Sequence, residues 1–104
     1  MRKKYRIEIT KTAKQDVASA HEIIARDKPK AAAKWVRVFD RHVRSLRYLP
    51  MRYEVIPEVD EIQVPYRHII WGNYRILYKI EEDLVTIVRV INAARLLRSR
   101  HLEE

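Results

Sequence analysis

The chain has 104 residues, 47% of them hydrophobic, so it can bury a core but is too short for a second domain. It has no cysteine, which excludes disulfides, zinc–thiolate sites and thiol nucleophiles, and no apolar run long enough for a membrane span or a signal peptide. The net charge is +8, which favours a polyanionic partner such as a nucleic acid or an acidic protein. We therefore expect one cytoplasmic domain with no membrane partner.

The beginning of the chain predicts a strand and then a helix. Residues 5–9 alternate apolar and polar side chains, as in a strand with one apolar face. Thr12 followed by Gln15 is a capping-box pattern, which predicts that a helix begins there. The apolar side chains on one face of this helix are Ala13, Val17, Ala20 and Ile24.

A second helix is predicted between Pro29 and Pro50. Proline is tolerated in the first turn of a helix, whereas the residue before a proline disfavours helical geometry. Few residues join the two helices, so we expect an antiparallel hairpin. One face of the second helix is apolar, and the opposite face carries Lys30, Lys34, Arg37, Arg41, Arg44 and Arg47. That basic face is either a solvated surface or a contact for nucleic acid or an acidic partner.

The second half of the chain predicts an irregular connection and three antiparallel strands. Residues 51–65 contain two prolines, which forbid a central strand there, and we expect one short extended piece around 53–56. Gly72-Asn73 is a two-residue hairpin signal and places Trp71 opposite Tyr74. Residues 84–91 are apolar at nearly every position, which indicates a central strand covered on both faces. The fold class is therefore α+β, an antiparallel sheet in the order β-α-α-β-β-β with a two-helix hairpin packed on one face.

The predicted hairpin register divides the side chains between the two faces of the sheet. The apolar face is expected to pack on the helices, and its members are Ile69, Trp71, Tyr74, Ile76, Tyr78 and Ile80. The other face is expected to be mixed and half-exposed, and its members are Tyr66, His68, Ile70, Arg75, Leu77 and Lys79.

Several residues on or after the mixed face have the chemistry that RNA cleavage requires. Attack by a 2′-hydroxyl needs a base, an acid and a cation for the charged phosphorane. His68, Tyr66 or His101 could supply the acid or the base. Arg75 and Arg95 could hold the phosphate through paired hydrogen bonds. The alternative is that these residues are only the solvated side of an open sheet.

Further candidate contacts for nucleic acid or a target protein are Arg67, Lys79, Arg98 and Arg100. A dedicated metal site is not expected, because the chain has four scattered histidines and no cysteine. A nucleotide cofactor is not expected either, because the single glycine cannot form a phosphate-binding glycine loop.

A strand, a helix hairpin and a meander containing GNYRILYKI and VTIVRVINAARLL together resemble the RelE/ParE superfamily of bacterial type II toxin–antitoxin toxins. The resemblance runs from about Tyr5 to Leu97. Its specific parts are Pro57-Glu58, the GNYRI at 72–76 and Arg95 shortly after the last strand. The resemblance implies a sheet backed by two helices and a cognate acidic antitoxin that wraps and neutralises the basic toxin.

RelE-like members of the superfamily cut mRNA in the ribosome. That likeness would make Arg75 and Arg95 phosphate-binding arginines. Tyr66 and His68 stand where such enzymes have lysines, and His101 stands about where they have a C-terminal tyrosine. These three departures argue against catalysis by the RelE-like route.

ParE-like members instead poison DNA gyrase and leave no catalytic set to recognise. The Pro57-Glu58 pair, the Arg67 that opens RHIIWGNYRI and the ending after VRV look more ParE-like, although Asn92 stands where such chains often have histidine. We therefore expect a toxin that inhibits gyrase by binding, with a ribosome-dependent mRNA endonuclease as the alternative.

Overall fold

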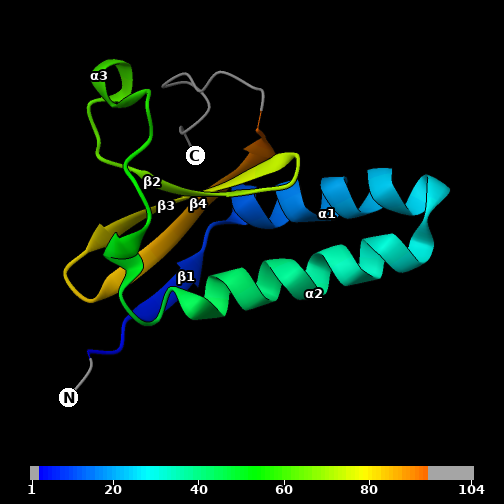
Figure 1. Cartoon of the computed structure of the whole chain (residues 1–104), viewed down its shortest axis with the longest axis horizontal. Coiled ribbons are helices and arrows are strands. Elements are labelled where there is room, and N and C mark those ends of the chain that lie inside the picture. The colour runs from blue at the N-terminus through cyan, green and yellow to red at the C-terminus, as the bar shows by residue number, and fades with distance from the viewer. Residues whose placement is uncertain (1–2, 94–104) are drawn as a thin grey trace.

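The computed structural model describes residues 3–93, which form a four-stranded sheet with two long helices packed on one face (Figure 1). The elements are β1 (Arg6–Ile9), α1 (Lys11–Asp27), α2 (Pro29–Ser45), the 3-10 helix η1 (Pro50–Arg52), α3 (Val59–Ile62), β2 (Arg67–Trp71), β3 (Tyr74–Glu81) and β4 (Leu84–Asn92). The predicted α+β class and order are confirmed, with α3 as an addition. None of the helices in this part of the chain is long and apolar enough to cross a membrane.

The sheet is mixed, with strand order β1-β4-β3-β2. Strands β2, β3 and β4 form the predicted antiparallel meander, and Trp71 pairs with Tyr74 across a turn in which Gly72 has φ +56°. Strand β1 pairs in parallel with β4, so the prediction of an antiparallel sheet throughout is wrong. The alternation of apolar residues has the same period in either direction, so it cannot show which way a strand distant in sequence docks.

Helix α1 begins directly after β1, two residues before the predicted start. Thr10 is the N-cap residue, and its hydroxyl oxygen accepts a hydrogen bond from the amide of Ala13 at 3.0 Å. The same hydroxyl donates to the carbonyl of Val88 at 3.1 Å. Thr10 therefore both starts the helix and fixes it to β4. The predicted N-cap at Thr12 is wrong, because the contact with β4 is not visible in the local sequence.

Helix α2 begins at Pro29 as predicted but ends at Ser45, before the expected stop at Pro50. The four residues that follow lead into η1, and Leu49 takes a left-handed conformation with φ +50°. The hydroxyl of Tyr78 donates to the carbonyl of Pro50 at 2.6 Å. This bond fixes the chain to β3 after it leaves α2.

The main core lies between the helices and the sheet, as the predicted apolar face requires. Its buried members are Tyr5, Ala13, Phe39, Val43, Leu46, Ile69, Ile76, Tyr78, Val85, Ile87 and Val90. A second, smaller core lies on the opposite face of β3 and β4, with Ile56, Ile62, Tyr66, Leu77, Val88 and Ile91. Strand β4 is thus central and covered on both faces, as predicted.

The connection between η1 and β2 provides the cover for the second core. Ile56 and Ile62 come from this connection, which rises past the strands in Figure 1 and carries α3 above the sheet. Val55 forms an isolated bridge with Arg67 at the edge of β2, which confirms the predicted extended piece. The expectation of a half-exposed second face is wrong for this part of the sheet. The two isoleucines follow no periodic pattern in the sequence, so the connection gave no sign that it would cover a face.

Candidate functional site

Arg75 is the central residue of the predicted site, and it is buried. It enters β3 one residue after the turn, and its guanidinium donates to both carboxylate oxygens of Glu58, at 2.7 and 2.9 Å. The two side chains are only 5% and 11% exposed. Glu58 immediately precedes α3, so this two-pronged ion pair holds the connection against the sheet.

His68 belongs to the same buried network. The Nε of Arg75 donates to Nδ1 of His68 at 3.1 Å, so the imidazole is neutral with its proton on Nε2. Burial, and then the neighbouring Arg75 charge, lower the pKa of His68. Its Nε2 lies 3.9 Å from a carboxylate oxygen of Glu54 and makes no hydrogen bond within residues 3–93. The His68 side chain lines a depression of about 330 Å³ but is only 4% exposed, so little of it is open to a substrate at the surface.

Tyr66 and Lys79 lie beside a shallow depression of about 600 Å³ on the same face of the sheet. Tyr66 belongs to the second core, and the amine of Lys79 pairs with Glu81 at 3.1 Å. Glu8 also lines the depression. With two carboxylates at its rim, this surface repels a phosphate backbone more than it attracts one.

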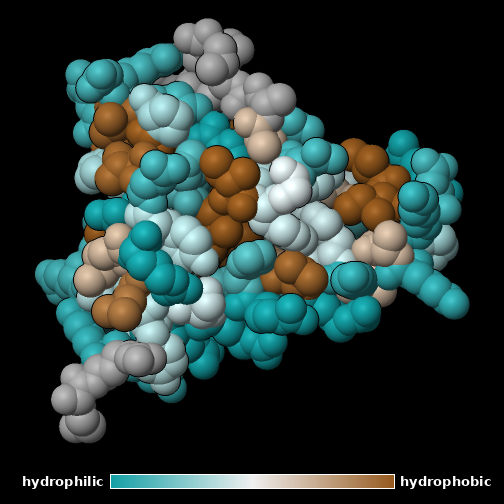
Figure 2. Space-filling model, viewed as in Figure 1, coloured by the Kyte–Doolittle hydropathy of each residue, from teal (hydrophilic) through white to brown (hydrophobic). Residues whose placement is uncertain are grey.

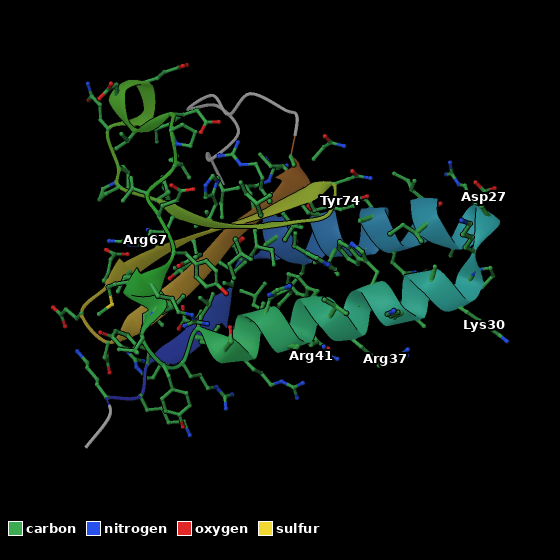
Figure 3. All side chains as sticks on the ribbon, viewed as in Figure 1. Asp27, Lys30, Arg37, Arg41, Arg67 and Tyr74 are labelled. Carbon is green, nitrogen blue, oxygen red and sulfur yellow. The ribbon has the colours of Figure 1, made fainter. Side chains whose placement is uncertain are left out.

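Arg67 performs a structural task in addition to any surface contact. Its guanidinium donates to the carbonyls of Met51 and Tyr53, at 3.2 and 2.6 Å. Both carbonyls belong to the chain that leaves α2, so Arg67 fixes the start of the connection to β2 (Figure 3).

The structure therefore brings Tyr66, His68 and Arg75 to one face of the sheet, as the register predicted, but it buries them. The remaining candidates, Arg95, Arg98, Arg100 and His101, lie outside the described residues 3–93. In the described range, no group of three or more histidine, aspartate or glutamate side chains is arranged to hold a metal ion.

Sequence reasoning missed two acidic partners, Glu58 and Asp16. Asp16 on α1 accepts from Arg89 at 2.7 and 3.0 Å and from the amide of Val90 at 2.9 Å. An arginine that is buried within an apolar strand needs a carboxylate partner, so Arg75 and Arg89 could have indicated that such partners exist. The sequence does not show which of the 14 acidic residues the partners are.

A mixed four-stranded sheet with two packed helices matches the fold of RelE/ParE-superfamily toxins. The chromosomal ParDE toxin–antitoxin system from P. aeruginosa matches it with a TM-score of 0.69 and 16% identity, over 85% of this chain and 95% of that chain. The RelBE2 toxin–antitoxin complex from Mycobacterium tuberculosis matches with a TM-score of 0.57 and 24% identity, over 88% of this chain and 94% of that chain.

The family within this superfamily follows from the sequence itself. Residues 7–97, most of the chain, match the family described as the ParE toxin of the type II toxin–antitoxin system parDE. The chain belongs to this ParE toxin family. Comparison with curated protein sequences gave no match.

Proposed function

We propose that this toxin inhibits DNA gyrase by binding to it and does not cut RNA. Membership of the ParE toxin family supports this activity. We further propose that the chain acts in the cytoplasm and is neutralised there by a cognate acidic antitoxin.

The burial of Arg75 and His68 is the observation that favours binding over catalysis. A ribonuclease must place a cation and an acid or base against a phosphate that approaches from solvent. Here the terminal nitrogens of Arg75 face Glu58, and Nδ1 of His68 accepts from Arg75. Freeing Arg75 would break a buried ion pair, and removing one partner of such a pair typically costs about 3–5 kcal/mol. In the described part of the sheet, Arg75 and His68 therefore stabilise the fold, whereas a RelE-like enzyme would need reactive groups open to the substrate.

Charge complementarity supports the proposed antitoxin. A net charge of +8 on 104 residues attracts an acidic chain over several ångströms and speeds its association. The two matching structures are both toxin–antitoxin systems, which is consistent with a partner of this kind.

The test compares two activities of the same purified chain. Plasmid supercoiling by gyrase should be inhibited, while mRNA on programmed ribosomes should stay intact. His101→Ala should keep full inhibition of gyrase, because the proposed activity needs no general acid at the C-terminal end. Cleavage of ribosome-bound mRNA that disappears in Arg95→Ala would refute the proposal and establish the endonuclease. In cells, pulse labelling just after induction should show DNA synthesis falling before protein synthesis.

A further inference from the structure

The outer side of α2 carries a straight row of cations, which we call the basic face of α2. It consists of Lys30, Lys34, Arg37, Arg41 and Arg44. At 3.6 residues per turn these five positions fall within an arc of about 80°, and they extend over about 21 Å along the helix axis. All five are exposed. Figure 3 shows Lys30, Arg37 and Arg41 on the side of α2 turned away from α1, and Figure 2 shows hydrophilic residues along this edge of the molecule.

No residue between positions 3 and 93 forms an ion pair with this row. The ion pairs found in that range involve other cations, namely Arg6, Arg26, His68, Arg75, Lys79 and Arg89. Asp40 is the one acidic residue of α2, lies at the flank of the row and forms no ion pair with it. The positive potential of the row is therefore directed into solvent.

Further positive charge lies past the end of α2. Arg47 lies in the turn after the helix, and its carbonyl accepts from the amide of Tyr5 at 2.8 Å, which places the start of β1 beside it. Lys4 and Arg47 line the same surface depression. The positive charge thus runs from the α1–α2 turn to the beginning of the sheet, and Asp40 is the acidic residue that lines a depression with Arg44 and Arg47.

We propose that the basic face of α2 binds the phosphate backbone of double-stranded DNA without regard to sequence. The major groove of duplex DNA is about 12 Å wide, so a rigid row of about 21 Å is long enough to cross it and reach phosphates of both strands. Single-strand binding sites add aromatic stacking platforms for the bases, whereas the aromatic residues Trp35 and Phe39 of α2 stack on each other in and against the core. The choice of DNA over duplex RNA rests on the proposed action on gyrase, whose substrate is duplex DNA.

Counterion release sets the size of the expected effect. If all five cations contact phosphates, the logarithm of the affinity should fall with the logarithm of the salt concentration with a slope of about −4.5. Each contact is then worth about 8-fold in affinity at 0.1 M salt, so losing two should weaken binding about 60-fold. The slope should become shallower at the same time, to about −2.7.

The experiment measures anisotropy of a labelled 20-base-pair duplex DNA of arbitrary sequence with the full chain, between 50 and 200 mM NaCl. Arg37→Gln/Arg41→Gln removes two charges from the row. Lys11→Gln/Lys14→Gln is the matched control, because it removes the same net charge from exposed positions on α1 that form no ion pair within residues 3–93. We expect the control to lose less than about threefold in affinity and to keep the salt slope of the parent. Lys34→Gln/Arg41→Gln is a second test should the first variant fold poorly by circular dichroism.

Equal losses in the row and control variants would overturn the proposal, since net charge alone would then explain binding. Unchanged DNA binding in the row variants would also overturn it. If those variants instead lost affinity only for an acidic antitoxin peptide, the row would be an antitoxin surface. The assay contains no gyrase, so its result is independent of whether the chain inhibits that enzyme. Failure of gyrase inhibition with intact DNA binding would refute the proposed function alone.

Discussion

Replacing Glu58 by glutamine tests whether the role of Arg75 is structural or catalytic. The substitution keeps the shape of the side chain but leaves the Arg75 guanidinium buried without its opposite charge. Because both side chains are nearly buried, at 5% and 11% exposure, the free energy of unfolding should fall by about 3–5 kcal/mol. For a domain of about 100 residues, each kcal/mol lowers Tm by about 4 °C, so we expect a decrease of roughly 12–20 °C.

Thermal unfolding followed by circular dichroism measures this change, and the chain supplies its own control. The Arg6–Asp83 pair has two similar hydrogen bonds, at 3.2 and 3.1 Å, but its side chains are 67% and 48% exposed. Asp83→Asn should therefore lower the free energy of unfolding by less than about 1 kcal/mol. A double-mutant cycle of Glu58→Gln with Arg75→Met should show strong coupling, because each variant removes the same interaction.

Two results would refute the structural role of Arg75. One is a Tm for Glu58→Gln no lower than that of Asp83→Asn. The other is mRNA cleavage that persists or rises when Glu58 is neutralised, since a phosphate-binding Arg75 would be freed by that change. The structural role predicts the reverse, with toxicity falling in Glu58→Gln only as far as the folded fraction falls.

Three further predictions concern His68, Asp16 and Gly72. Burial, and then the charge of Arg75, lower the pKa of His68 in the folded chain. The imidazole therefore binds a proton more readily in the unfolded chain than in the folded one. The free energy of unfolding should fall as the pH drops below about 6.5, and His68→Gln should flatten that decline in urea titrations; an unchanged slope would contradict the assignment. Asp16→Ala should cost about 2–3 kcal/mol and speed hydrogen exchange at the Val90 amide, which donates to Asp16 at 2.9 Å; retained protection would count against this role. Gly72→Ala should lower stability by about 1 kcal/mol through its positive φ alone, since an added Cβ meets nothing within 4 Å, and Gly72→Asn should recover part of the Tm.

The local features of this fold could be predicted because they depend on residues close in sequence. The alternation from Tyr66 to Ile80 predicted which side chains share a face, and Gly72 predicted the turn that sets the register. Proline at 29 predicted the boundary between the two helices, which the structure places at Lys28. In each case residues that are adjacent in the sequence decide the geometry.

The state of the candidate site could not be predicted, because it depends on a distant segment. Glu58 lies 17 residues before Arg75 in an irregular connection, and nothing periodic indicates that this connection folds onto the sheet. The sequence therefore predicted a solvated surface for this face, although Ile56 and Ile62 complete a core on it with Tyr66 and Leu77. The parallel docking of β1 belongs to the same class of long-range feature.

The position of the compensating acids decides where the +8 charge acts. Counted along the sequence, the arginines of the sheet and of α2 are equivalent, but Arg75 and Arg89 are each paired with a carboxylate from a neighbouring element. Each carboxylate cancels the charge of its arginine at long range, so these two arginines stabilise the fold and contribute little to the attraction of a polyanion. Arg37 and Arg41 have no such partner within residues 3–93. Among these arginines, those of α2 should therefore attract a polyanion more strongly than Arg75 and Arg89 of the sheet. It follows that substitutions in the sheet should act on this toxin mainly through stability, whereas substitutions on α2 should act through association rate and salt dependence.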